Sequence, residues 1–211
     1  MKKLSLQAFT GLLLLLFVSC GPTIYKSENF DASRAKIKTV AILPFTVSID
    51  AKRLPKGMSI ETLKQSEEKT GYDIQSSAYT WLLQRQEKFT VTFQDIDKSN
   101  ALIKKAGIVY QDITLTDKAE LCKLLGVDAI ISGKTTMSKP MSEGAAIAVG
   151  LLVGAWGNTN KATAALTIHD GAGDLMWKYD HDFGGSVGSS ADALTTQLMK
   201  NASKKFPYRN N

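Results

Sequence analysis

The residues Thr39–Phe45 (TVAILPF) form a nearly unbroken apolar run that includes a proline near its end. A strand that is apolar at both odd and even positions is buried on both faces, as in a sheet covered by helices on each side. Asp128–Thr135 (DAIISGKT) has the same character. The sequence therefore predicts two buried central strands in a layered α/β domain.

A loop, a helix and a strand are predicted after the first central strand. Thr46–Lys69 is polar and has the pattern of a long loop. Gly71–Lys88 has a helical period, and Phe89–Phe93 alternates between apolar residues and threonine, as a strand does. The apolar side of the helix consists of Ile74, Ala78, Trp81 and Leu82.

Capping residues indicate two further helices before the second central strand. Asp97 is expected to begin a short helix that Gly107 ends. Asp117 and Glu120 have the spacing of a capping box, and Gly126 would end that helix. The order strand, helix, strand, helices, strand favours an α/β layer structure.

A hairpin and a last helix complete the predicted domain. Two alternating strands, Ala164–Ile168 and Leu175–Phe183, flank the turn residues Asp170–Asp174 (DGAGD). A serine at 189 or 190 is expected to cap a final helix that Pro207 ends. The apolar stripe of this helix consists of Ala191, Leu194, Leu198 and Ala202.

These elements predict one α/β domain over residues 39–206, with a mixed β-sheet of about five strands and helices packed on it. Residues 207–211 are expected to be a tail, and residues 144–157 an apolar, glycine-rich insertion.

The N-terminal residues have the parts of a secretory signal peptide, with two lysines followed by the apolar stretch Gly11–Val18. Phe17–Gly21 (FVSCG) resembles a bacterial lipobox, in which the cysteine is acylated and becomes the new N-terminus. The apolar stretch is too short to span a bilayer as a helix. We predict a signal peptide over 1–19 and a lipid anchor on Cys20.

Two or three acyl chains on Cys20 would anchor the protein stably in a membrane. Gly21 stands where the enterobacterial sorting rule has aspartate in inner-membrane lipoproteins, which favours the outer membrane. Residues 20–38 are polar and aperiodic, so we expect a tether there. The net charge of +6 would suggest nucleic acid for a cytoplasmic protein, but an exported protein does not meet it, and its Lys and Arg are scattered.

Two histidines and four aspartates in or near the hairpin suggest a metal site, but the strand register argues against it. Pairing Ile168 with Trp177 places His181 opposite Ala164 on the core face and His169 on the other face. A calcium loop of the EF-hand type fails as well, because its twelfth position would be His181 instead of glutamate. We expect no metal.

No nucleophile elbow, P-loop, zinc-protease motif or C-x-x-C motif occurs in the sequence. Cys122 lies in the apolar pattern Leu121–Leu125, which predicts a buried structural thiol. The sequence therefore predicts a protein that is not an enzyme and has no cofactor.

The segment Gly144–Trp156 (GAAIAVGLLVGAW) is apolar and too short to cross a bilayer as one helix. Small residues recur there every four positions, a spacing that lets helices approach closely. Two interpretations stay open: a core element packed on the sheet, or a surface that touches the membrane or a neighbouring subunit. The contact residues would be Ala146, Gly150, Leu151, Leu152, Gly154 and Trp156.

Three stretches in this order resemble one family. Val40–Phe45 opens the domain, followed by Leu125–Gly133 (LGVDAIISG) and Ile168–Trp177 (IHDGAGDLMW). Together they resemble the envelope lipoproteins related to the curli-export lipoprotein and the TolB N-terminal domain, a group that includes neisserial GNA-type and Pel exopolysaccharide ring lipoproteins. The resemblance covers about residues 38–206.

The resemblance implies a TolB N-terminal-like α/β domain at the periplasmic face of the outer membrane. Members of the group form rings, assist export machines, or activate penicillin-binding proteins. This chain lacks two long alternating segments that would form transmembrane hairpins, so a self-made channel is not expected. We therefore expect a non-enzymatic accessory or oligomeric subunit of an envelope export or assembly system. The alternative is a monomeric periplasmic regulator that binds a cell-wall or envelope enzyme.

Overall fold

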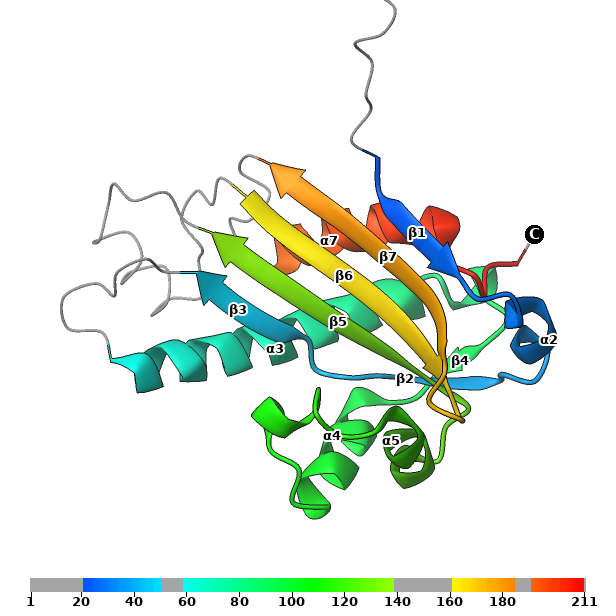
Figure 1. The fold of residues 1–211 in the computed structure, drawn as a ribbon, viewed down its shortest axis with the longest axis horizontal. Coiled ribbons are helices and arrows are strands. Elements are labelled where there is room, and N and C mark those ends of the chain that lie inside the picture. The colour runs from blue at the N-terminus through cyan, green and yellow to red at the C-terminus, as the bar shows by residue number, and fades with distance from the viewer. Residues whose placement is uncertain (1–20, 51–58, 139–160, 185–190, 211) are drawn as a thin grey trace, which may run out of the picture.

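A mixed sheet runs through the domain, with helices on both of its faces (Figure 1). The computed structural model describes residues 21–50, 59–138, 161–184 and 191–210. Within these ranges the sheet has seven strands. They are β1 (Thr23–Lys26), β2 (Thr39–Ile42), β3 (Thr46–Asp50), β4 (Thr92–Phe93), β5 (Ala129–Ser138), β6 (Lys161–Asp170) and β7 (Leu175–Gly184).

Five described helices and three short 3-10 turns accompany the sheet. The helices are α2 (Phe30–Arg34), α3 (Ile60–Leu83), α4 (Ile96–Lys105), α5 (Lys118–Leu125) and α7 (Ala191–Ala202). The 3-10 turns are η2 (Gln86–Lys88), η3 (Tyr110–Asp112) and η5 (Ser203–Lys205). Helices α3 and α7 cover one face of the sheet, and α4 and α5 lie against the other face at the β2 end (Figure 1).

The strand order is β1-β7-β6-β5-β2-β4, and β3 also pairs with β5. The pairs of β2 with β4 and β5, and of β3 with β5, are parallel, whereas the pairs β5–β6, β6–β7 and β7–β1 are antiparallel. Strands β2 and β3 thus run along β5 one after the other, with a break around Pro44. Proline has no N–H to donate to a neighbouring strand, which accounts for an interruption at this position.

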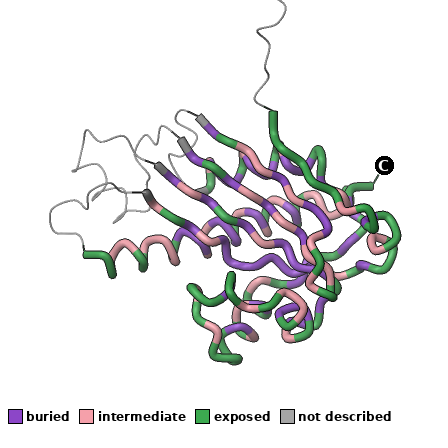
Figure 2. The backbone as a smooth tube through the Cα atoms, viewed as in Figure 1, coloured by how far each residue is buried: buried purple, intermediate pink, exposed green. Residues whose placement is uncertain are grey.

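The first central strand is buried on both faces, as its sequence predicts (Figure 2). Val40 and Ile42 face the core formed with α3 and α7. Ala41 and Leu43 face a second core formed with α4 and α5. No side chain of these four is more than 1% exposed, so both periods of the strand contribute burial.

The predicted hairpin register is confirmed. Ile168 pairs with Trp177 and Ala164 pairs with His181, with an irregularity between Ile168 and His169. The Asp170 carboxylate accepts hydrogen bonds from the N–H groups of Ala172 and Asp174, both at 3.0 Å. Asp170 therefore stabilises the turn itself, as aspartate does in hairpin turns.

The predicted helix caps are confirmed for α5 and shifted for α4. Asp117 accepts a hydrogen bond from the Glu120 N–H, and Gly126 ends α5 with a φ of 67°. The cap of α4 is Asp95, whose side chain accepts from the Lys98 N–H, so the prediction of Asp97 was wrong by two residues. Asp97 lies in the first turn instead, where a negative charge also favours a helix.

The prediction of a tether over residues 20–38 was wrong for Thr23–Lys26 and Phe30–Arg34, which form a strand and a helix of the domain. Strand β1 pairs antiparallel with β7 along all four of its residues, and α2 follows it. Phe30 is 1% exposed and packs against Tyr208, with ring centroids 5.9 Å apart. All four residues of β1 are exposed, so the strand carries no apolar alternation that would indicate it in the sequence.

The predicted loop over Thr46–Lys69 was wrong at both ends. Its first residues form β3, and α3 begins at Ile60, where the Ser59 side chain accepts a hydrogen bond from the Thr62 N–H. The first turns of α3 are exposed or half-buried. They therefore lack the apolar stripe that marks the rest of the helix.

The prediction of a C-terminal tail over 207–211 was also wrong for its described part. Tyr208 is fully buried, and its carbonyl oxygen accepts a hydrogen bond of 2.8 Å from the Thr90 N–H. Asn210 donates its N–H to the carbonyl oxygen of Lys88, also at 2.8 Å. The chain end is therefore fastened beside η2. None of the helices in the described ranges is long and apolar enough to cross a bilayer.

Candidate functional site

The residues that the sequence singles out for lipidation and contact lie outside the described residues. This applies to Cys20, to the serines at 189 and 190, and to the apolar segment. The affected contact candidates are Ala146, Gly150, Leu151, Leu152, Gly154 and Trp156.

The two histidines lie on opposite faces of the sheet. His169 is paired with Ile130, which belongs to the core beneath α5, whereas His181 contacts the rings of Tyr179 and Phe183 on the other face. Burial lowers the pKa of His169, and the positive charge of Lys118 lowers it further. Within the described residues no group of three or more His, Cys, Asp or Glu side chains is placed to hold a metal ion.

Cys122 is buried, as its sequence context predicts. Burial, together with the charges of neighbouring carboxylates, raises the pKa of its thiol to about 11. Its Sγ donates a weak hydrogen bond to the Asp170 carbonyl oxygen at 3.5 Å. Because the thiolate is the reactive form of cysteine, this side chain is unsuited to act as a nucleophile at neutral pH.

A small cavity of about 160 Å³ lies beside the break between β2 and β3, where the residues after η3 and the first residue of α5 approach the middle of β5 and β6. Its lining includes Lys118, Ser132 and Lys134. The Lys118 amino group donates to the carbonyl oxygens of Ile113 and Thr116, at 2.9 and 3.1 Å, and burial lowers its pKa. The Ser132 hydroxyl has no partner among the described side chains, so no base activates it as a nucleophile.

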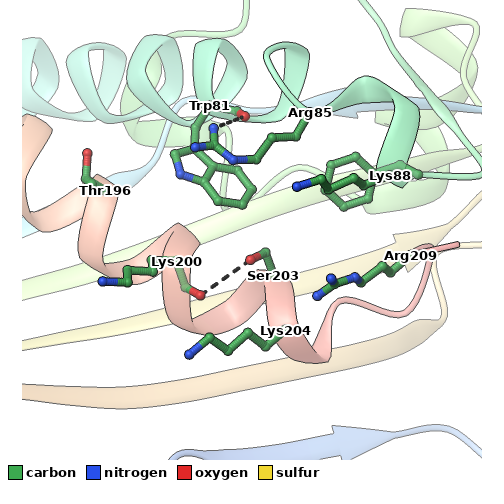
Figure 3. Close-up of a pocket in the computed structure, with 9 residues that line it drawn as sticks. Trp81, Arg85, Lys88, Thr196, Lys200, Ser203, Lys204 and Arg209 are labelled. Atoms are coloured by element: carbon green, nitrogen blue, oxygen red, sulfur yellow. Dashed lines mark hydrogen bonds between the residues drawn. The ribbon is translucent and has the colours of Figure 1, made fainter. Parts of the chain in front are cut away.

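A larger cavity, of about 300 Å³, lies between the C-terminal ends of α3 and α7 (Figure 3). Figure 3 shows Trp81 of α3 with Arg85 and Lys88, which follow this helix, on one side, and side chains of α7 and η5 on the other. Five of its lining residues are cationic: Arg85, Lys88, Lys200, Lys204 and Arg209. Apart from Trp81 and Phe89, the other lining residues are a threonine and a serine, and no carboxylate lines it.

Contacts with neighbouring residues hold the two arginines of this cavity in place. The Arg85 guanidinium lies over the Trp81 ring, with Cζ 4.1 Å from the ring centroid, and it donates to the Trp81 carbonyl oxygen at 3.1 Å. An arginine in this arrangement is held by a cation–π contact. Arg209 is brought to the same place because its backbone forms a bridge with Phe89.

A second cavity, of about 350 Å³, adjoins the first and shares Lys204 and Arg209 with it. The side chain of Arg34 helps to join its walls by donating to the Arg209 carbonyl oxygen at 3.0 Å. We call the two cavities together the basic groove. Its cations are Lys26, Arg34, Arg85, Lys88, Lys200, Lys204, Lys205 and Arg209.

The basic groove leaves almost no signal in the sequence. Its cations come from five separate stretches between residues 26 and 209, so the Lys and Arg residues are indeed scattered along the chain. Only the pair Lys204–Lys205 is a local signal, and it lies in an exposed last turn, where basic residues are common. The cluster exists because the fold brings the ends of α2, α3 and α7 together.

No family model matches the chain, and no curated protein matches its sequence. Among solved structures, lipoprotein GNA1162 from Neisseria meningitidis is 13% identical, with a TM-score of 0.49 over 80% of this chain and 96% of that one. The PelC dodecamer from Paraburkholderia phytofirmans is 13% identical, with a TM-score of 0.44 over 90% and 99%. The LpoB C-terminal domain from Salmonella enterica is 9% identical, with a TM-score of 0.36 over 74% and 95%.

Proposed function

We propose that this protein is a non-enzymatic lipoprotein of the outer membrane, held by an acylated Cys20, that serves as an accessory or oligomeric subunit of an envelope export or assembly system. The signal-peptide pattern and the lipobox-like stretch Phe17–Gly21 support the anchor. The family resemblance of the central strand and the hairpin supports the role in an envelope assembly.

The observation that carries the proposal is the edge strand β1. It begins three residues after Cys20, and among the described strands it pairs with β7 alone. Ile24 and Tyr25 are 41% and 48% exposed, large values for apolar and aromatic side chains. An unprotected edge strand is a place where a second strand adds to the sheet.

The orientation of the free edge follows from one hydrogen bond. The Ser27 N–H donates to the Met176 carbonyl oxygen at 3.0 Å. Because N–H groups of an antiparallel strand alternate in direction, those of Ile24 and Lys26 point away from β7. Two N–H donors close to the proposed lipid anchor are therefore free to pair with a strand of a second subunit.

The non-enzymatic part of the proposal draws on the described side chains. The two histidines are on opposite faces, burial raises the pKa of the one described thiol, and the Ser132 hydroxyl has no hydrogen-bond partner among the described residues. A hydrolytic activity that disappears in a folded His181→Ala variant would contradict it.

The proposed anchor is tested by metabolic labelling with radioactive palmitate and by membrane fractionation. We expect the wild-type chain to incorporate label and to sediment with the outer membrane. The Cys20→Ser variant should incorporate none. Label in the variant, or an unlabelled wild-type chain, would remove the anchor from the proposal.

The proposed assembly is tested by the native mass of the lipidated protein in a mild detergent. A closed assembly of several subunits supports the accessory-subunit function. A monomer contradicts it and favours the alternative, a monomeric regulator of an envelope enzyme. The open face of the β5–β7 sheet, with exposed Lys134, Thr163 and Asp182, is the surface that such a regulator would offer.

A further inference from the structure

Most of the positive charge of the basic groove has no ion-pair partner among the described residues. Three ion pairs occur among the described residues, and only Lys26–Asp31, at 2.9 Å, involves a cation of the groove. Lys88, Lys200, Lys204 and Arg209 are exposed. Exposed side chains such as these contribute little to the stability of the fold. Their clustering therefore suggests a role in binding.

The dipoles of the neighbouring helices offset only part of this positive charge. The first cavity lies at the C-terminal ends of α3 and α7, and each end is equivalent to roughly −0.5 elementary charge. The two ends together offset about one of the cavity's five cations. A surplus of about four positive charges remains, which favours an anionic ligand.

The chemistry of the groove suits phosphate groups. Arginine offers a planar fork of N–H donors to phosphate oxygens, and lysine acts as a mobile point charge beside it. Arg85 is already held over the Trp81 ring and bonded to the Trp81 carbonyl oxygen, so its side chain loses little conformational freedom when it binds a ligand. The Trp81 and Phe89 rings add apolar surface to the lining, which can contact the non-polar part of a headgroup.

The position of β1 indicates where such phosphates come from. Ile24 and Lys26 of this strand line the second cavity. Ile24 follows Cys20 by four residues, a reach of at most about 14 Å. An acyl chain on Cys20 would therefore hold this part of the groove close to the headgroups of its own bilayer. The distance is comparable to the Debye length of about 8–10 Å, beyond which salt screens the attraction between charges.

We propose that the basic groove binds the phosphate groups of anionic lipids in the leaflet that carries the acyl chains of Cys20. This inference rests on the proposed lipid anchor and deepens it. The lipid holds the chain at the surface, and the groove fixes the rotation of the domain about that anchor. The acyl chains on Cys20 and the polybasic groove would thus make two separate contacts with the same membrane.

The test uses the mature chain, residues 20–211, with Cys20→Ser, so that no acyl chain contributes to binding. Every described strand pair and both cores lie within this part of the chain. We expect it to sediment with vesicles of phosphatidylglycerol and phosphatidylethanolamine, and not with vesicles of phosphatidylcholine alone. Added salt should release it.

A triple variant, Lys88→Ala with Lys200→Ala and Lys204→Ala, should lose about 100-fold in affinity for the anionic vesicles, or about fivefold per lysine. The matched control is Lys98→Ala with Lys104→Ala and Lys123→Ala, three exposed lysines on α4 and α5. These substitutions remove the same charge from the opposite face of the sheet, and the affinity for the anionic vesicles should fall much less.

Equal loss in the two triple variants would overturn the proposal, as would equal binding to phosphatidylcholine. Inorganic phosphate that binds the groove in a chain with no affinity for anionic vesicles would also overturn it, in favour of a soluble anion. Palmitate labelling is measured on the protein with Cys20 intact. A missing lipid anchor and a groove that binds no lipid therefore give separate results.

Discussion

The Tyr110 hydroxyl bridges the break between β2 and β3: it donates a hydrogen bond of 2.6 Å to the Phe45 carbonyl oxygen and accepts one of 3.0 Å from the Val47 N–H. Strand β2 ends at Ile42 and β3 begins at Thr46, with Pro44 between them. The two backbone groups therefore lack the regular pairing of a continuous strand. One side chain from η3 thus supplies partners that the sheet does not.

Replacing this tyrosine is expected to destabilise the domain. Tyr110→Phe leaves the Phe45 carbonyl and the Val47 N–H without their partner, and an unsatisfied buried polar group costs about 1–3 kcal/mol. The free energy of unfolding in urea measures the loss. Tyr72→Phe is the control, because that ring packs against Tyr110 but none of the hydrogen bonds described uses its hydroxyl. Equal stability of Tyr110→Phe and wild type would contradict the bridging role.

The same tyrosine predicts a loss of stability at alkaline pH. Burial raises the pKa of Tyr110 from 10.0 to about 12, and neighbouring carboxylates also raise it. A group whose pKa is higher in the folded state contributes stability below the unfolded pKa, and loses it as pH rises through the folded one. The contribution of Tyr110 should therefore be complete below pH 10 and fall between pH 10 and 12. Urea titrations across this range should show a steeper decline for wild type than for Tyr110→Phe.

Gly71 should tolerate no side chain. A Cβ at this position would overlap the Phe45 carbonyl oxygen and the Tyr110 ring. We expect Gly71→Ala to cost about 1–3 kcal/mol, as overpacking of a core does. The control is Gly171→Ala, whose Cβ would meet its nearest neighbour, the Asp128 carbonyl oxygen, at an ordinary 3.5 Å. Thermal unfolding of both variants distinguishes a steric clash from a general effect of replacing glycine.

Proline substitutions test whether the β1 edge joins subunits. Ile24→Pro removes an N–H that points away from β7, so the fold should remain stable while strand addition is blocked. Tyr25→Pro removes an N–H that points toward β7 and should lower the melting temperature. Native mass in detergent is the readout. An assembly that persists unchanged in Ile24→Pro would exclude this edge as the interface.

Cys122 should react slowly in the folded protein. Burial raises the pKa of its thiol to about 11, so little thiolate exists at neutral pH. We expect Ellman's reagent to modify this thiol slowly in buffer and quickly in concentrated urea, measured on the mature chain with Cys20→Ser. Rapid modification under native conditions would show that α5 opens readily from the sheet.

Several elements could be predicted because a short stretch of sequence determines them. Thr39–Phe45 is apolar at every position that the two cores need, and the pair Asp117 and Glu120 marks the start of α5. The hairpin register followed from alternation alone, since a slip of one residue would expose Trp177. In each case the physical cause, burial of one face or a local cap, acts within a few residues.

Other elements depend on partners far away in the chain. The residues of β1 are exposed, and they are a strand only because β7 offers its edge to them. Pro44 divides one apolar run into two strands, and Tyr110, 65 residues away from Phe45, stabilises the division.

The sequence by itself therefore determined the layered α/β class, the central strands, the hairpin and the caps of α5. Only the tertiary structure decided that the expected tether is a strand and a helix, and that eight scattered cations form one groove. The reason is physical. Apolar periodicity and capping are local, whereas charge clustering and edge pairing depend on which distant elements the core brings together.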